Sequence, residues 1–432
     1  MTTTIGEKMS DIRSEYTDGL DFYGQTNPFE LLAQWGAPLY VYNEKILRQR
    51  CRDLVSLSDH SGFRVNYSVK ANSNPVLLAI IRSEGLMADA MSPGELYMNE
   101  LAGYEPANTL YIANNITADE MAAAVAKGCL TSVDSLAQLD ILGSLNRGGR
   151  AMIRINPGIG AGHSEKVITA GRNTKFGISP DDLDKVFRIL HKHDLVLAGI
   201  NQHIGSLFME PASYLAAARV LLDLIETLPP EILASLEYID FGGGFGIPYH
   251  KYEHEKRLDL AELGKGLHEL VSAFAVKMNY GGKFLIEPGR YVAAECGLLL
   301  GSVTSVKENA GIRYAGTDLG FNNLMRPVMY GSFHDLEIYR QEKCPPEKEI
   351  PQTIVGNICE SGDVLARDRL LPPLRIGDIL AVLDAGAYGF SMASNYNERF
   401  LPAEVLIRQD GSPRLIRRRQ NVRDLAQCLE IS

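Results

Sequence analysis

A lysine that closes a strand-like segment has the clearest potential for chemistry in this sequence. Lys70 follows the run Phe63-Arg64-Val65-Asn66-Tyr67-Ser68-Val69, which alternates and is rich in β-branched and aromatic residues. Such a run predicts a largely buried strand over 63–69. An amine at the mouth of a strand, backed by an apolar core, is disfavoured in its charged form, and the neutral amine is the form that makes a Schiff base with an aldehyde. The alternative is a lysine that extends into solvent at the strand end.

Glycine-rich and polar motifs follow three later strand-like runs. They are Gln202-His203-Ile204-Gly205-Ser206, Gly242-Gly243-Gly244-Phe245-Gly246 and Glu287-Pro288-Gly289-Arg290. The glycine run lacks the dinucleotide-binding spacing, because Ile247 occupies the place of the final glycine. Consecutive glycines nevertheless expose backbone N–H groups to an anion such as phosphate. A plain tight turn is the alternative interpretation of this run.

Two of these side chains are suited to a ring-shaped cofactor. Glu287 follows an apolar run and precedes a proline, which favours an extended conformation. A carboxylate there could keep the ring nitrogen of a pyridine cofactor protonated and so make the ring an electron sink. The imidazole of His203 could stack on the same ring. The alternatives are a salt bridge between Glu287 and Arg290 and an ordinary packed histidine.

The C-terminal part of the chain contains three further polar clusters. Arg326 and Tyr330 lie four residues apart, a combination that binds carboxylates if the segment is helical. Cys359-Glu360-Ser361-Gly362-Asp363 places a thiol beside two carboxylates, and this thiol is either a proton donor or an inert cysteine. Tyr388 lies among small residues that permit close approach of a ligand.

Between residues 63 and 290 short apolar runs alternate with helical stretches. The eight strand candidates are 63–69, 86–89, 110–113, 130–133, 151–155, 196–200, 238–241 and 284–286. Eight such alternations predict a closed (β/α)8 barrel, with a doubly wound open sheet as the alternative. In a barrel of this type the functional groups lie where the strands end, which is where Lys70 and the three motifs occur.

The pattern changes after residue 295, where helical periodicity fades. Short strand-like runs at 354–356, 379–383 and 405–407 are separated by Gly, Pro and Asn turns. We therefore predict two domains, a barrel over 46–295 and a mostly-β second domain formed by 1–45 plus 296–432. The run 38–42 is a candidate partner strand for this second domain, although the sequence leaves that pairing open.

Composition excludes several classes of function. The formal net charge is -10, from 43 basic and 53 acidic residues, whereas a nucleic-acid partner requires a basic surface. The basic cluster 414–419 is predicted to be the solvated face of an edge strand, with a targeting or polyanion-binding site as the alternative. Six scattered cysteines without a C-x-x-C pair predict neither a disulfide framework nor a metal site. With no apolar run of membrane-spanning length and no signal-peptide pattern, the expected location is cytoplasmic.

In chain order, the motifs resemble those of the barrel-type (fold III) pyridoxal-phosphate decarboxylases. The matching segments are Tyr67-Ser68-Val69-Lys70-Ala71-Asn72, His203-Ile204-Gly205-Ser206, the triple glycine 242–244, Glu287-Pro288-Gly289-Arg290 and Cys359-Glu360-Ser361-Gly362-Asp363. The similarity extends from about residue 36 to the C-terminus and is strongest to the diaminopimelate decarboxylases of this family. It implies pyridoxal 5'-phosphate as the cofactor and a homodimer with shared active sites.

The resemblance also implies a role for each motif residue. Lys70 would carry the cofactor as a Schiff base, His203 would stack on its ring, and Cys359 would return a proton to the α-carbon of the substrate. Glu287 would pair with the pyridine nitrogen. The other implied cofactor contacts are Ser206, Gly243, Gly244, Gly289, Arg290 and Tyr388. The implied substrate contacts are Arg290, Arg326, Tyr330, Glu360 and Tyr388.

A physical argument bears on the substrate. A substrate with an amino-acid group at each end needs an anion binder and a cation binder away from the cofactor, and Arg326 with Glu360 supplies that pair. The hypothesis is decarboxylation of meso-2,6-diaminopimelate to L-lysine and CO2, the last step of lysine biosynthesis. The loop 168–177 departs from the commoner family pattern at Ala170 and Arg172.

Two alternative functions remain open at this point. A racemase of the same barrel class usually has an arginine at the ring nitrogen, and Glu287 opposes that interpretation. A non-catalytic binding protein would be expected to have lost Lys70 or Cys359, and both are present.

Overall fold

The computed structural model of the chain describes residues 11–112, 114–156, 158, 175–342, 345 and 347–430. The chain divides into two compact units. The barrel unit comprises Leu47–Pro248 and Lys256–Val292, and the β unit comprises Met1–Ile46, Tyr249–Glu255 and Ala293–Ser432. Within the described residues, none of the helices combines the length and the apolar character that crossing a membrane requires.

Eight parallel strands form the barrel unit. They are β3 (Phe63–Tyr67), β4 (Met87–Ala90), β5 (Leu110–Ile112), β6 (Leu130–Val133), β7 (Arg150–Arg154), β8 (Val196–Asn201), β9 (Tyr238–Asp240) and β10 (Lys283–Ile286). Each strand pairs with its neighbour in the chain, and β10 pairs with β3, which closes the ring. The predicted (β/α)8 barrel is therefore confirmed, and the open-sheet alternative is wrong.

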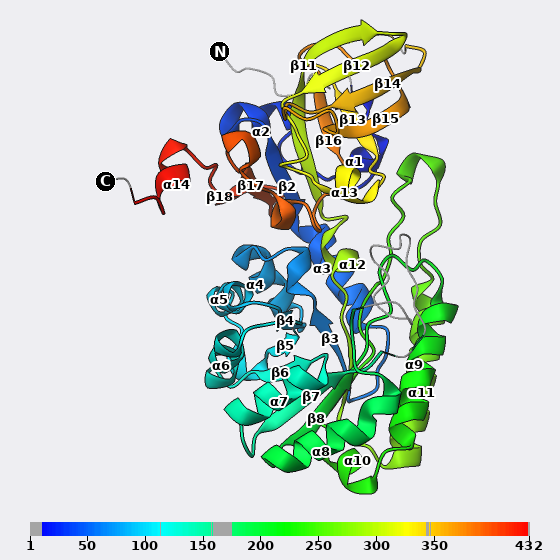
Figure 1. Cartoon of the computed structure of the whole chain (residues 1–432). Helices are drawn as coiled ribbons and strands as arrows, with labels where there is room; N and C mark the ends of the chain where they lie inside the picture. Colours follow the sequence, from blue (N-terminus) through cyan, green and yellow to red (C-terminus); the bar gives the residue numbers. More distant parts are fainter. Residues whose placement is uncertain are drawn as a thin grey trace. The chain divides into compact units, whose positions relative to one another are not determined.

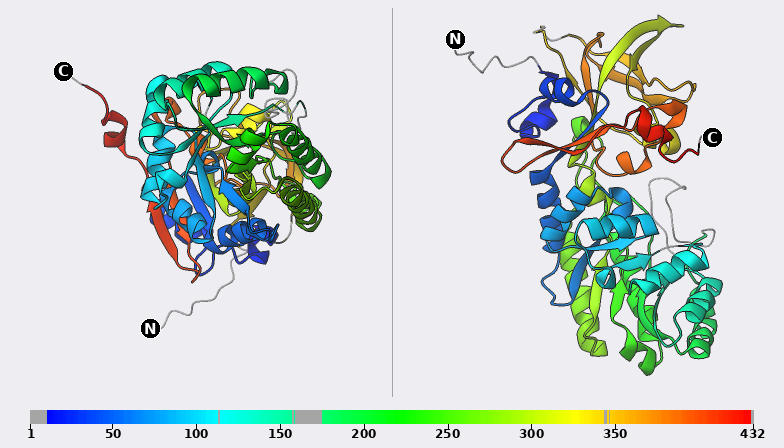
Figure 2. Two further views of the ribbon diagram at one scale, coloured as in Figure 1. Left: turned by 90° about the horizontal axis from the view of Figure 1, so that it is seen from below. Right: turned by 90° about the vertical axis from the view of Figure 1, so that its left-hand side faces the viewer.

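Helices cover the outside of the strand ring (Figures 1 and 2). They are α4 (Pro75–Ser83), α5 (Pro93–Leu101), α6 (Ala118–Ala126), α7 (Leu136–Leu145), α8 (Leu183–His193), α9 (Pro211–Glu226), α10 (Pro230–Ser235) and α11 (Leu260–Met278). The helix α3 (Glu44–Val55) and the short α12 (Arg290–Ala293) lie where the chain passes between the units.

Side-chain caps start the first four helices after the strand ends. Asn74, Ser92, Thr117 and Ser135 each accept a hydrogen bond from a backbone N–H of the first turn of α4, α5, α6 and α7. Those N–H groups have no partner inside the helix, so an oxygen at this position fixes where the helix begins. Fixed helix starts in turn fix the length of the loops at the C-terminal ends of the strands.

The interior of the barrel is filled by apolar side chains from several of its strands. The buried cluster consists of Leu110, Ile112, Leu130, Met152, Ala198 and Leu285. Branched and long side chains of this kind close the barrel interior. The barrel therefore has two separate ends.

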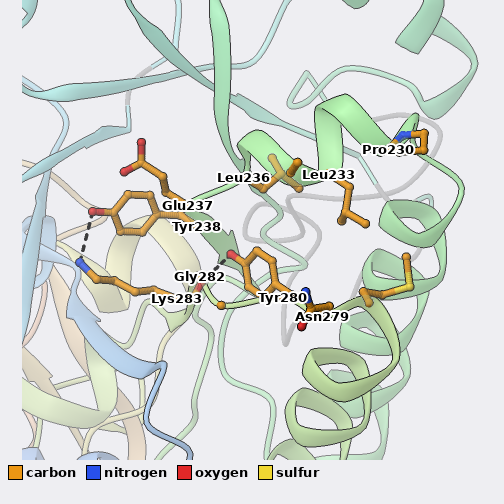
Figure 3. Close-up of a pocket in the computed structure, with 12 residues that line it drawn as sticks. Pro230, Leu233, Leu236, Glu237, Tyr238, Asn279, Tyr280, Gly282 and Lys283 are labelled. Carbon is orange, nitrogen blue, oxygen red and sulfur yellow. Dashed lines mark hydrogen bonds between the residues drawn. The ribbon is translucent and has the colours of Figure 1, made fainter.

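At the N-terminal ends of β9 and β10 the surface is hollowed (Figure 3). This cavity of about 710 Å³ includes Tyr238, Tyr280 and Lys283 in its lining. The Lys283 amine lies 3.5 Å from the Tyr238 hydroxyl, and Tyr280 donates a hydrogen bond to the Lys283 carbonyl. The cavity lies at the end of the strands opposite to Lys70, and residues at that end of a barrel mainly serve stability.

The β unit is built on a ten-stranded sheet. Its strands are β1 (Asp11–Arg13), β2 (Leu39–Asn43), β11 (Gly297–Asn309), β12 (Ile312–Thr317), β13 (Leu336–Tyr339), β14 (Ile350–Val355), β15 (Val364–Leu371), β16 (Ile379–Val382), β17 (Ala403–Ile407) and β18 (Pro413–Arg417). Its short helices are α1 (Glu15–Gly19), α2 (Pro28–Trp35), α13 (Arg326–Tyr330) and α14 (Val422–Ala426).

The long strand β11 organises this sheet, since it pairs with β2, β12 and β16 (Figure 1). The N-terminal strand β2 also pairs in parallel with β17, which answers the question that the sequence left open about residues 38–42. The basic cluster begins in β18, which pairs only with β17 among the described strands. Three of its arginines have defined partners, since Arg417 pairs with Glu404, Arg418 with Asp424, and Arg419 with the carbonyl of Pro38.

We predict that Leu285→Ala lowers the free energy of unfolding by about 2–5 kcal/mol, because it removes a fully buried side chain and leaves a cavity in the barrel core. Chemical denaturation followed by circular dichroism measures this loss. Val276→Ala on α11 is the matched control, because Val276 is 85% exposed and its truncation should change stability by less than about 0.5 kcal/mol. Equal effects of the two substitutions would contradict the placement of Leu285.

Candidate active site

Lys70 lies in a tight turn directly after β3. The predicted strand 63–69 is two residues too long, because β3 ends at Tyr67 and residues Val69–Ala71 form a 3₁₀ turn. The buried carboxylate of Asp89, on β4, causes this early end. It accepts hydrogen bonds from the Val69 N–H at 2.8 Å and from the Ser68 hydroxyl at 3.0 Å. The neighbouring strand therefore fixes the backbone that carries the lysine.

His203 lies in the loop that follows β8, with its ring in the protein interior. The Gly243 N–H donates a hydrogen bond to His203 Nδ1 at 3.2 Å, so this nitrogen carries no proton. Burial, with the nearby charges of Lys70 and Arg154, lowers the pKa of His203 well below its usual 6.5. The imidazole is therefore neutral, with its proton on Nε2.

A cavity of about 160 Å³ at the C-terminal end of the strands brings several of these groups together. Lys70 and His203 both line it, as do Asp134, Arg154 and Phe176. The guanidinium of Arg154 lies 4.6 Å from the centre of the Phe176 ring. The combination of an amine, a flat imidazole and an arginine in one enclosed space suits a planar anionic molecule.

The glycine run after β9 forms a closely packed loop. Gly242 and Gly244 have φ angles of 76° and 108°, which side chains rarely adopt. A Cβ at Gly243 would overlap the carbonyl oxygen of Glu287. The Glu287 N–H also donates to the Gly242 carbonyl at 2.9 Å, so this loop and the end of β10 are held together through their backbones.

Two buried carboxyl groups meet at this point. Asp240, the last residue of β9, is hydrogen-bonded to Glu287, and both side chains are buried. Burial and the nearby carboxyl of the other raise the pKa of Glu287 well above 4.5, and burial raises the pKa of Asp240 to about 7. Apart from the opposite carboxyl group, Asp240 Oδ2 and Glu287 Oε1 have no hydrogen-bond partner among the described residues.

Two further buried titratable residues, Asp89 and Arg154, lie near Glu287, and sequence reasoning missed both. Burial and the nearby Glu287 carboxyl raise the pKa of Asp89 well above its usual value. Burial lowers the pKa of Arg154, while Glu287 and Asp134 oppose that shift. Asp89, Arg154 and Asp240 each lie on a barrel strand near its C-terminal end. A charged residue at the end of an apolar run was the available signal, and it is the same signal that singled out Lys70 and Glu287.

The remaining predicted cofactor residues of the barrel unit lie in the same loops. Arg290 donates a hydrogen bond to the Ser206 hydroxyl at 2.9 Å, which connects the loop after β8 with the turn after β10. Two residues before Arg290, the carbonyl of Pro288 accepts a hydrogen bond from the Ser68 N–H. Gly289 lies between them, so the turn 287–290 is tied to the lysine-bearing segment.

In the β unit, Arg326 and Tyr388 lie together. Residues Arg326–Tyr330 form the helix α13, so the helical spacing assumed for Arg326 and Tyr330 is present. Arg326 is only 2% exposed, and its guanidinium carbon lies 5.8 Å from the centre of the Tyr388 ring. A second ring, that of Tyr249, lies 5.5 Å from the same guanidinium. Tyr330 is half-buried on the last turn of the helix.

Cys359 and Glu360 occupy an exposed turn of the β unit. The Cys359 N–H donates a hydrogen bond to the Asn397 side chain at 2.9 Å. The Tyr396 hydroxyl donates to Glu360 Oε1 at 2.6 Å. The segment 396–397 therefore holds the thiol and the carboxylate in place, a role that sequence reasoning missed. The variant part of the loop 168–177, with Ala170 and Arg172, lies outside the described residues.

Comparisons with known proteins show the family to which this chain belongs. Residues 45–294 match the model of the family "Pyridoxal-dependent decarboxylase, pyridoxal binding domain". Diaminopimelate decarboxylase of Methanothermobacter thermautotrophicus is 38% identical over 93% of this chain and 94% of its own length. This chain belongs to the diaminopimelate decarboxylase family. The resemblance inferred from the motifs is confirmed, and pyridoxal phosphate is the cofactor of this family.

Solved structures of diaminopimelate decarboxylases share the fold. One crystal structure is 34% identical, with a TM-score of 0.84, and the match covers 92% of this chain and 94% of the other. The enzyme of Helicobacter pylori, solved in complex with L-lysine, is 28% identical with a TM-score of 0.81, covering 93% of this chain and 98% of the other. The described residues fit the cofactor, because the barrel offers Lys70 and His203 in one cavity and the buried Glu287 carboxyl close to Lys70.

We predict that Asp240 makes the cofactor-free protein less stable as the pH rises. In the folded protein this carboxyl keeps its proton up to about pH 7, whereas the unfolded chain releases it near the ordinary pKa of 3.8. The protonated Asp240 makes its full contribution to the free energy of unfolding below about pH 4. This contribution is lost as the pH rises through 7. Asp240→Asn keeps the acceptor for the Gly242 N–H and removes this titration. As the pH rises from 4.5 to 8, the free energy of unfolding of the variant should therefore increase relative to that of the wild type, on the order of a few kcal/mol.

Denaturation of both proteins at the two pH values measures this difference. Asp223→Asn is the matched control, since Asp223 is an exposed carboxylate on α9. A constant difference between wild type and Asp240→Asn across this range would contradict the burial of a protonated carboxyl.

Proposed function

We propose that this chain is a pyridoxal-phosphate-dependent decarboxylase that converts meso-2,6-diaminopimelate to L-lysine and CO2, the last step of lysine biosynthesis. Membership of the family supports the reaction. The observation in the structure that carries it is the cavity in which the amine of Lys70 lies with His203, beside the buried pair of Asp240 and Glu287. These groups provide a covalent anchor, a stacking surface and an acid for a ring nitrogen.

Each barrel residue has a defined task in this proposal. Pyridoxal phosphate, when bound, supplies the electron sink that accepts the electron pair left when CO2 departs. Lys70 would hold the cofactor through its amine and would release it to the amino group of the substrate, which leaves the lysine amine free. Glu287 keeps the ring nitrogen protonated, and the neutral imidazole of His203 stacks on the ring. The phosphate of the cofactor would be held by Ser206, Gly243, Gly244 and the turn with Gly289 and Arg290.

The substrate contacts are inferred from the resemblance. We assign Arg326, with Tyr330, Tyr388 and Arg290, to substrate carboxylate binding, and Glu360 to the amino group at the far end. Tyr388 also contacts the cofactor in this proposal. An arginine and a carboxylate away from the cofactor suit a substrate with amino-acid groups at both ends, whereas a simple diamine product needs no second carboxylate binder.

Cys359 is assigned to the final proton transfer. Its thiol donates a proton to the α-carbon after CO2 has left. Cys359 and Glu360 are exposed in the single chain, which supports a homodimer in which this turn reaches a neighbouring subunit's barrel. We also infer a cytoplasmic location, from the scattered cysteines of the sequence.

Release of CO2 from a panel of amino acids tests the proposed reaction. We expect CO2 and L-lysine from meso-diaminopimelate, and far slower release from L-ornithine, L-arginine or D-lysine. Lys70→Ala should reduce the release to the background of the assay, because the amine that exchanges with the substrate is lost. Release from ornithine or arginine, but not from meso-diaminopimelate, would contradict the assigned substrate. Borohydride reduction followed by peptide mapping identifies the modified lysine independently of the substrate.

Glu287→Gln should lower kcat on the order of 10²-fold, the magnitude found when one charge-stabilising group is removed from an active site. The amide has nearly the same size but cannot hold a positive charge on a ring nitrogen. Steady-state kinetics with meso-diaminopimelate measure the change, and the absorbance of the bound cofactor shows that the variant is still loaded. A loaded variant with wild-type kcat would exclude the assigned role of Glu287.

A further inference from the structure

Arg326 is held by a set of neighbours that none of the motifs indicated. It is 2% exposed, and His334, eight residues later, is 3% exposed. Arg326 Nε lies 3.4 Å from His334 Nε2, and Arg326 Nη2 lies 3.2 Å from the Ser332 hydroxyl. The ring of Tyr249 packs against both residues, at 5.5 Å from the guanidinium carbon and 5.3 Å, edge to face, from the imidazole.

The second nitrogen of His334 determines its protonation state in this arrangement. His334 Nδ1 lies 2.8 Å from the carbonyl oxygen of Leu383. A carbonyl only accepts hydrogen bonds, so Nδ1 carries the proton. Arg326 Nε–H only donates, so Nε2 must present its lone pair. The neutral imidazole protonated at Nδ1 is the one form that satisfies both contacts.

This arrangement restricts how Arg326 can bind an anion. A guanidinium binds a carboxylate through two parallel N–H donors. These donors are either Nε and one Nη, or Nη1 and Nη2. The single hydrogen of Nε is engaged by His334. A carboxylate that binds Arg326 with two hydrogen bonds therefore has to use the Nη1–Nη2 end.

We propose that His334 is a positioning residue for substrate binding, which orients Arg326 so that its Nη1–Nη2 end receives a carboxylate of the substrate. The proposal rests on the function assigned to Arg326 above. The bond from His334 to Leu383 adds rigidity, because Leu383 follows β16 and lies five residues before Tyr388, the other ring beside the guanidinium. His334 thus ties Arg326 to the segment that carries Tyr388.

Two matched variants separate positioning of Arg326 from a merely structural role. His334→Asn keeps an N–H where Nδ1 donates to Leu383 but offers no acceptor to Arg326. His334→Gln places its side-chain oxygen near the position of Nε2 and loses the bond to Leu383. For the holoenzyme with meso-diaminopimelate, we expect His334→Asn to raise KM about tenfold, with kcat changed much less. His334→Gln should remain closer to the wild type. The reverse order of the two variants would overturn the proposal.

A double-mutant cycle gives a second, independent test. An Arg326→Lys background removes the guanidinium, whose Nε donates to His334 and which His334 would orient. Adding His334→Asn to this background should therefore raise KM by less than twofold more. Additive effects would show that His334 acts elsewhere and would overturn the proposal. Ser332→Ala, which removes only the Nη2 contact, should raise KM by a smaller factor and is the variant to use if the His334 substitutions do not fold.

The absorbance of the lysine-bound cofactor distinguishes a failure of the proposed reaction from a failure of the role assigned to His334. If the wild type forms this species but releases no CO2 from meso-diaminopimelate, the proposed function fails. If the wild type is active and His334→Asn is folded, loaded and unchanged in KM, the function stands and the role of His334 is wrong.

Discussion

Asp240 and Glu287 are hydrogen-bonded to each other, and both side chains are buried. Two buried negative charges at this distance would repel each other strongly, so the pair retains a proton, and the pKa of each group is raised. Lys70 and Arg154 offset part of this effect. The protonation state of each group therefore depends on its burial and on the charge of its neighbours. Both exist only in the closed barrel.

The backbone around this pair is equally constrained. The glycine loop after β9 packs on the carbonyl of Glu287 so closely that Gly243 admits no side chain. Asp89 holds the turn of Lys70 from the next strand, and the Pro288 carbonyl holds the same segment from the last strand. A fixed backbone favours the reaction of the Lys70 amine, because few groups around it have to change position when the substrate binds.

In the β unit, buried ion pairs and ring packing fix the position of a chain segment. Segment 249–255 follows the barrel strand β9 in the chain but packs within the β unit. Its Lys251 forms buried ion pairs with Glu295 and Asp384, at 2.6 Å and 3.3 Å, while Tyr249 packs against Arg326 and His334. Buried charges that are paired in this way are costly to separate, so the segment is firmly anchored. The glycine loop is thus joined, by a few residues of chain, to the environment of Arg326.

The sequence alone was sufficient for the barrel, because short apolar runs and helical stretches repeat eight times and each motif follows the end of a run. It also placed Lys70, His203 and Glu287 at strand ends, since that position depends only on local order along the chain. The tertiary structure decided that β3 stops at Tyr67, because the bonds that end it come from Asp89, in the next strand. It also decided the shared proton of Asp240 and Glu287 and the tautomer of His334. Periodicity reports on neighbours along the chain, whereas burial, charge and hydrogen bonding depend on groups that only the folded chain brings together.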